Sequence, residues 1–120
     1  MNNSYKELKK ITDSYYSGQI EYFSPLVLGL LLEYKIKPRQ KDGNLHSVQI
    51  SIPKSKPDSI VVGLRYFKKD KTNSEDHFLF EKGFGIKKCY GKKLEELLTE
   101  YKGTHKTQLK SSEEVKLRKV

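Results

Sequence analysis

The sequence lacks the features that mark extracellular and membrane proteins. It has one cysteine, Cys89, in 120 residues, so it cannot form an intramolecular disulfide. Its longest apolar run, 25–32, is far shorter than the roughly 20 residues that span a bilayer. No secretory signal pattern opens the chain. We therefore expect a cytoplasmic protein without a membrane partner, and the length predicts a single compact domain.

Motifs for metal ions and cofactors are lacking as well. The sequence has no cluster of metal ligands and no phosphate-binding loop, so we expect no cofactor and no metal. Asp58, Glu81 and Lys82 do not have the carboxylate-x-lysine spacing of a metal nuclease. The sequence places no histidine to activate Cys89, which favours a structural cysteine. A non-enzymatic protein is the favoured interpretation.

What the sequence has in excess is positive charge. Lysine and arginine number 24 against 15 acidic residues, a formal net charge of +9. Residues 35–71 alone hold ten basic residues and three aspartates, a net charge of +7. Such a field attracts polyanions, and nucleic acid is the commonest partner of a basic protein without membrane features. We expect DNA, RNA or a protein complex that handles nucleic acid as the partner, in an oligomeric state that the sequence leaves open.

The first predicted element is a helix over residues 5–16. Apolar side chains recur there every three to four positions, and Gly18 suits the residue that follows the last turn. Ser4 and Glu7 have the spacing of a capping box, which predicts that they satisfy the first amide donors of the helix.

The next stretch is ambiguous. A Ser-Pro pair favours a second helix over residues 25–31, although the sequence leaves open whether these residues form a helix or a strand, and the alternation from residue 30 to residue 39 indicates a strand. The turn at 42–44 would then join that strand to a second alternating run, 48–52, with Ile36 opposite Ile50.

Two further strands are predicted from alternating hydrophobicity. Residues 59–69 and 77–87 each alternate, and the polar loop between them predicts a hairpin. Lys82 and Gly83 interrupt the second strand, where we expect a bulge or a strand break.

A closing helix follows, because Leu94, Leu97, Leu98 and Tyr101 obey helical spacing and Gly103 suits its end. The predicted fold is therefore α+β, a mostly antiparallel four- to five-stranded sheet with an N-terminal helical segment and a C-terminal helix packed on one face. The domain is expected to cover residues 1–103. The polar, basic residues 104–120 are expected to form a flexible tail.

The predicted binding surface is the sheet face that the helices leave open. Even-numbered strand residues are mostly apolar and are expected to be buried, so the odd-numbered residues form a basic plate. Its lysines and arginines would contact phosphates, and a single aromatic side chain is too few for strong base reading, so weak sequence selectivity is expected. The candidate nucleic-acid-binding residues are Lys35, Lys37, Arg39, Arg65, Phe67, Lys69 and Lys87.

Residues Lys82–Ile86, Lys-Gly-Phe-Gly-Ile, resemble the opening of the RNP1 motif of the RNA-recognition-motif family. The resemblance implies a sheet that stacks RNA bases on exposed aromatic residues. The chain departs from the motif where Lys87 replaces an aliphatic residue and Cys89 an aromatic one. Phe84 also shares its parity with the apolar residues of the strand, so we expect it in the core and do not assign the chain to this family.

Two other functions remain open. One is a phage or mobile-element accessory protein that binds, and inhibits or assists, a nucleic-acid-processing machine. The other is a small metal-independent ribonuclease that uses His46 and His77 as base and acid, with Arg65 nearby. Because the two histidines differ in parity, they are expected on opposite faces unless a bulge intervenes.

Overall fold

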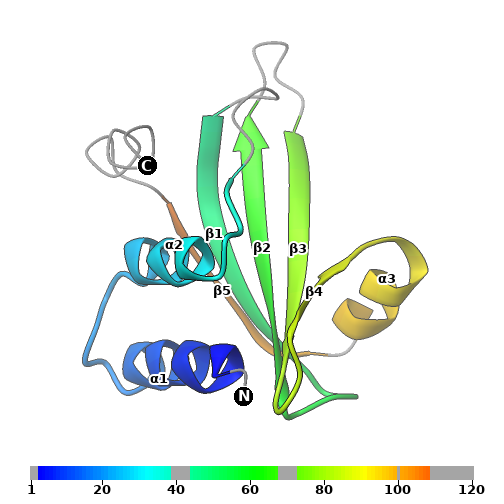
Figure 1. Cartoon of the computed structure of the whole chain (residues 1–120), viewed down its shortest axis with the longest axis horizontal. Coiled ribbons are helices and arrows are strands. Elements are labelled where there is room, and N and C mark those ends of the chain that lie inside the picture. The colour runs from blue at the N-terminus through cyan, green and yellow to red at the C-terminus, as the bar shows by residue number, and fades with distance from the viewer. Residues whose placement is uncertain (1–2, 39–43, 68–72, 100, 109–120) are drawn as a thin grey trace.

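The computed structural model describes residues 3–38, 44–67, 73–99 and 101–108, which form the helices and strands of an α+β fold. In chain order the elements are α1 (Ser4–Tyr16), α2 (Ser24–Glu33), β1 (Asn44–Pro53), β2 (Ser59–Phe67), β3 (Asn73–Glu81), β4 (Ile86–Cys89), α3 (Gly91–Thr99) and β5 (Tyr101–Gln108). The strands form one antiparallel sheet in the order β4-β3-β2-β1-β5 (Figure 1). The predicted α+β class is confirmed.

The main core lies between one sheet face and helices α1 and α2. Even-numbered residues of β2 face these helices, as the alternation predicts, together with apolar residues of β1 and β3. Fully buried side chains stabilise a fold by about 1.5–3 kcal/mol each, so this layer is a main source of stability. Its largest fully buried members are Tyr66, Phe23, Phe80, Leu8, Leu31, Ile50 and Leu64.

Helix α1 confirms the prediction for residues 5–16, but its start differs from a capping box. Ser4 is already helical and is completely buried, and no side chain caps the helix. Glu7 instead accepts a hydrogen bond from the Tyr34 hydroxyl at 3.2 Å. The predicted capping box is wrong because tertiary packing uses both of its side chains.

Helix α2 resolves the ambiguous stretch in favour of the helix. The predicted strand over 30–39 and its hairpin are therefore wrong, and β1 pairs with β2 and β5 instead. The helix is apolar on nearly all sides, so its leucines fit a period of two as well as a period of 3.6. Of the predicted turn at 42–44, residues 42 and 43 lie outside the described residues, and Asn44 begins β1.

The β2–β3 hairpin is confirmed, with Val62 opposite Phe78. The interruption predicted at Lys82 and Gly83 is a tight turn that reverses the chain into β4. Gly83 has φ +79°, a conformation that glycine adopts without strain, and the Phe84 amide donates to the Glu81 carbonyl at 3.0 Å. This turn takes Phe84 out of the sheet.

Helix α3 packs on the sheet face opposite to α1 and α2. Its buried Leu97 contacts Val61 of β2 and Leu79 of β3, with Leu94, Leu98 and Cys89 beside them. The expected placement of the closing helix beside the N-terminal helices is therefore wrong. The reason is that Val61 and Leu79 form an apolar area on the odd-numbered face, and packing α3 on this area removes it from water.

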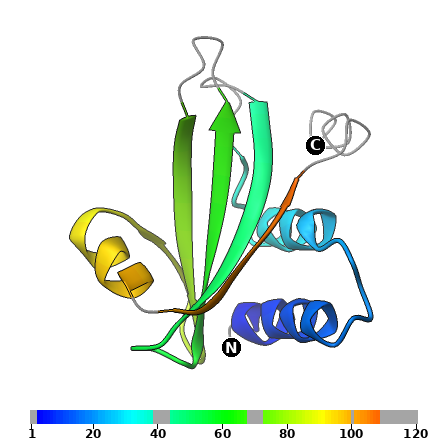
Figure 2. The ribbon, with the colours of Figure 1, turned by 180° about the vertical axis from the view of Figure 1, so that it is seen from behind.

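Strand β5 occupies part of the predicted tail. Residues Tyr101–Gln108 pair antiparallel with β1 at the edge opposite β4 (Figure 2), so neither the helix end at Gly103 nor a tail from residue 104 is correct. Main-chain hydrogen bonds hold an edge strand whatever its side chains, so a polar composition did not exclude one. The rest of the predicted tail, 109–120, lies outside the described residues.

Candidate nucleic-acid interface

The predicted basic plate is divided in the structure. Lys35 and Lys37 follow α2, in a turn where Lys35 has φ +62°, and belong to no strand. Arg65, Phe67 and Lys87 lie on β2 and β4. Because the strand expected over 30–39 is absent, the two lysines do not join the other three on one sheet face. The remaining candidates, Arg39 and Lys69, lie outside the described residues.

On the odd-numbered face, Arg65 already has an acidic neighbour. It lies opposite Glu75, and its Nε is 3.4 Å from the carboxylate Oε1. Phe67 is 42% exposed and packs edge-on against His46, with ring centroids 4.2 Å apart. At this end of the sheet, Glu75 therefore partly neutralises the charge of Arg65, and the Phe67 ring already packs against His46.

A denser basic surface lies along β4, the edge strand. Residues 82–93 contain five lysines and no acidic residue. We define the β4 edge as Lys82, Phe84, Lys87, Lys88, Tyr90, Lys92 and Lys93. Two of these lysines face acids across the sheet: Lys87 lies 3.9 Å from Glu81 and Lys88 lies 3.7 Å from Asp76. Both lysine side chains are well exposed, and both distances exceed a hydrogen bond, so the pairs are weak and leave the lysines available to an anion.

Two aromatic residues of the β4 edge flank the strand β4 itself. Phe84, 61% exposed, lies in the turn before β4, and Tyr90, 74% exposed, follows it. Five residues separate them, so their Cα atoms lie at most about 22 Å apart. Sequence parity predicts Phe84 in the core, and this prediction is wrong. The glycines on either side of Phe84 are typical of the turn that the structure shows.

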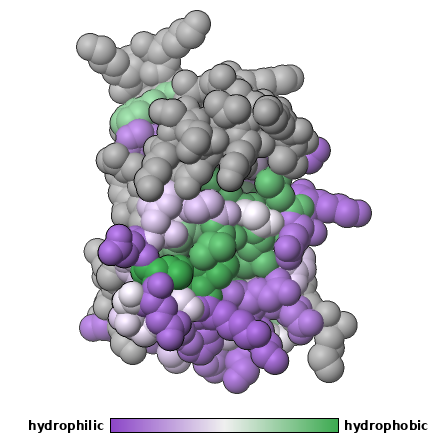
Figure 3. Space-filling model, turned by 90° about the vertical axis from the view of Figure 1, so that its left-hand side faces the viewer, coloured by the Kyte–Doolittle hydropathy of each residue, from purple (hydrophilic) through white to green (hydrophobic). Residues whose placement is uncertain are grey.

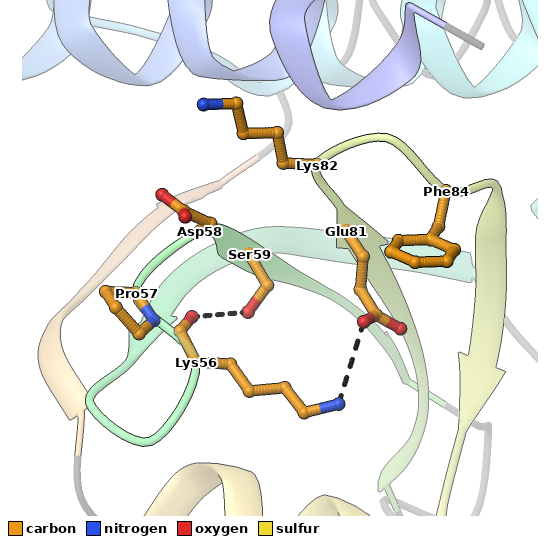
Figure 4. A pocket seen from close by; sticks show the side chains of 7 residues that line it. All are labelled: Lys56, Pro57, Asp58, Ser59, Glu81, Lys82 and Phe84. Carbon is orange, nitrogen blue, oxygen red and sulfur yellow. Dashed lines mark hydrogen bonds and ion pairs between the residues drawn. The ribbon is translucent and has the colours of Figure 1, made fainter. Parts of the chain in front are cut away.

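Beside Phe84 lies a pocket of about 400 Å³, lined by residues of the β1–β2 loop and of the turn before β4. Figure 4 shows the Glu81 carboxylate between the Phe84 ring and the Lys56 ammonium, which is 3.6 Å away. The loop is held in place because the Ser59 hydroxyl donates to the Lys56 carbonyl at 2.6 Å. The pocket therefore combines an aromatic ring, acidic acceptors and ammonium groups.

Cys89 has a histidine neighbour, contrary to the expectation from sequence. It lies directly opposite His77, and both line a second pocket, of about 280 Å³. His77 packs over Gly63, where a Cβ would meet the imidazole at 3.1 Å, so only glycine fits without a shift. Burial lowers the pKa of His77 and raises the pKa of the Cys89 thiol. Both shifts favour the neutral forms, and a neutral thiol is a poor nucleophile.

The His77 shift predicts a pH-dependent stability. In the unfolded chain the imidazole titrates near pH 6.5, whereas burial holds its pKa lower in the folded protein, against the opposing influence of Glu75 and Asp76. Below about pH 6.5 the unfolded state therefore binds the proton first, and stability is lost as pH falls towards the folded pKa. Each pKa unit of difference is worth about 1.4 kcal/mol.

Urea unfolding between pH 7.5 and 5 should show this loss of stability, and His77→Gln should reduce it. An NMR titration midpoint of His77 at or above 6.5 would contradict the assignment.

The two histidines of the ribonuclease interpretation lie on strands that are not neighbours. A bulge between Leu45 and Ser47 removes the parity objection, but β2 separates His46 on β1 from His77 on β3. Two strand spacings amount to about 9.5 Å between their backbones. His46 packs on Phe67 and His77 lies over Gly63 on the intervening strand. This arrangement does not favour a shared catalytic site.

Within the described ranges, no group of three or more His, Cys, Asp or Glu side chains is placed to hold a metal ion. No helix in the same ranges is long and apolar enough to cross a membrane.

The geometry defines a small α+β protein with helices on both faces of its sheet and a basic edge strand that two exposed aromatic side chains flank. No family model, curated protein or solved structure matches the chain.

Proposed function

We propose that the protein is a non-enzymatic nucleic-acid-binding protein that holds single strands along the β4 edge. One observation carries the proposal. The two most exposed large hydrophobic side chains of the described residues, Phe84 and Tyr90, lie on either side of an edge strand, within an acid-free run of five lysines. Stacking platforms combined with a positively charged track are the features that proteins use to bind single strands.

In this mode of binding, the lysines contact phosphates as point charges and fix the path of the strand. Phe84 and Tyr90 stack on bases, which a single strand exposes and a duplex does not. Since every base has an aromatic face, the lysines and stacking give little sequence preference. Affinity should therefore depend strongly on salt.

Removing lysines from the β4 edge tests the proposal. In a Lys88→Gln, Lys92→Gln, Lys93→Gln variant, the plot of log affinity against log salt should be shallower by about 2, because each phosphate contact to a single strand contributes about 0.7. Five such contacts in the wild type correspond to about a 100-fold loss of affinity between 50 and 200 mM salt. Fluorescence anisotropy with a labelled single-stranded DNA oligonucleotide measures both quantities.

A matched control separates the edge from overall charge. Lys6→Gln, Lys10→Gln, Lys37→Gln removes the same charge from exposed positions on α1 and after α2. Its salt dependence should stay close to that of the wild type. Equal losses in both triple variants would show that net charge, not the β4 edge, controls binding. No binding by the wild type at low salt would reject the function.

A second candidate, a protein-binding accessory role, draws support from a different surface. Figure 3 shows an apolar area framed by hydrophilic residues on the side of the molecule where α1 and α2 lie. Leu26 of α2 is 47% exposed, and Tyr16 of α1 is 46% exposed. Exposed apolar areas of this kind occur at protein interfaces. A stoichiometric protein complex that persists after nuclease treatment would favour this role.

A further inference from the structure

We infer that the pocket beside Phe84 selects guanine from the bound strand, with Glu81 reading the base. This inference rests on the proposed function, because the lysines of the β4 edge must first hold the strand. It adds one base-selective position to binding that is otherwise weakly selective.

The position of Glu81 suits an acceptor of hydrogen bonds. Its oxygens lie 3.6 Å from the Lys56 ammonium and 3.9 Å from the Lys87 ammonium. Both distances exceed a hydrogen bond, so the lysines balance the negative charge while the oxygen lone pairs stay available to a ligand. The Glu81 side chain is only 20% exposed, less than either lysine, and water therefore competes less for it.

Guanine fits this acceptor better than the other bases. Its Watson–Crick edge presents two adjacent donors, N1–H and the N2 amino group, which one carboxylate can accept together. Cytosine and adenine present one amino donor beside a ring nitrogen that accepts. Thymine and uracil present one N–H between two carbonyl oxygens. In these three bases the second carboxylate oxygen would face an acceptor, and an ionised carboxylate has no proton to donate.

The rest of the pocket suits the remainder of a nucleotide. Phe84 lies next to Glu81 in the pocket (Figure 4), where its ring can stack on a planar base. Lys56 and Lys82 line the same space, beside the carboxylate of Asp58, and their ammonium groups can contact a flanking phosphate. A volume of about 400 Å³ lies within the range of small-ligand pockets and is ample for one base.

Four oligonucleotides test the inference: an eight-residue thymidine strand, and the same strand with one central guanine, adenine or cytosine. Their affinities for the wild type are measured by fluorescence anisotropy at one salt concentration. The guanine strand should bind about 5- to 100-fold more tightly than the thymidine strand, the discrimination that a good bidentate contact provides. Adenine and cytosine should gain much less. Equal affinities for all four strands would overturn the inference.

Glu81→Gln and Glu75→Gln form a matched pair of variants. Both remove one negative charge from β3, but Glu75 lies outside the Phe84 pocket and faces Arg65. Glu81→Gln should abolish the guanine preference while thymidine binding stays equal to, or rises above, that of the wild type. Glu75→Gln should keep the preference. A preference that survives Glu81→Gln would overturn the role of this carboxylate.

Two further measurements keep the test decisive. Thermal unfolding establishes whether Glu81→Gln is folded. If it is not folded, Phe84→Ala is tested in its place, and its preference for the guanine strand should be smaller than that of the wild type. Failure of the proposed function has a different appearance, because the thymidine strand itself would then not bind. Salt-dependent thymidine binding without a guanine preference would reject only the pocket.

Discussion

Replacing Phe80 with alanine is expected to lower the free energy of unfolding by about 3–5 kcal/mol, the range for a phenylalanine removed from a packed core. Phe80 is completely buried and lies between Ile60 of β2 and Ile86 of β4 in the main core. The cavity left by its ring cannot collapse readily, because the sheet backbone on both sides is fixed by paired strands. Urea unfolding followed by circular dichroism measures the loss.

Phe84→Ala is the matched control for this substitution. It removes the same ring four residues further on, but from a side chain that is 61% exposed, so the free energy of unfolding should change by no more than about 0.5 kcal/mol. The same variant should bind single strands less tightly, since a stacking platform is lost. A loss of stability as large as that of Phe80→Ala would place Phe84 in the core and remove it from the β4 edge.

Alternation in the sequence predicts burial correctly for Phe80 and wrongly for Phe84. Alternation identified β2 and much of β3, because a strand with one face on a core must alternate, and Phe80 was placed correctly. Parity continues only while the chain stays in one strand. The turn at Gly83 resets the relation between residue number and sheet face, so Phe84 could not be assigned by counting from Phe80.

The sequence did not predict two other elements correctly, because the contacts that determine them are not local. The even-numbered leucines of α2 fit a strand as well as a helix, and tertiary contacts decide between the two. Strand β5 depends on pairing with β1, a partner some fifty residues earlier in the chain. Sequence patterns report the faces of single elements well and the pairing of distant ones poorly.

The same distinction applies to the candidate site. Net charge predicts an anionic partner, and this stays a prediction. The place of that charge on the surface depends on which strands form. With the strand over 30–39 absent, Lys35 and Lys37 no longer join Arg65 on a sheet face. The run of lysines along the β4 edge is visible in the sequence. Its exposure depends on β4 being an edge strand, which only the sheet order reveals.

Substituting Val61 with aspartate is expected to destabilise the protein by about 3–5 kcal/mol, the range for an uncompensated buried charge. Val61 points away from the main core, but helix α3 covers it with Leu97, and it is only 1% exposed. A carboxylate there has to be desolvated, or α3 must leave the sheet and expose its leucines. Were the closing helix on the other face, as its sequence suggested, Val61 would face solvent and the substitution would be nearly harmless.

Phe67→Asp provides the control on the same strand and the same face, beyond the reach of α3. Phe67 is 42% exposed, so its replacement should cost no more than about 1 kcal/mol, mainly the contact with His46. Urea unfolding of the two variants measures the difference directly. Equal stabilities would mean that α3 does not cover β2. A loss of stability in Val61→Asp alone would confirm that helices cover both faces of the sheet. The β4 edge is then the exposed part of the sheet that lies nearest to α3.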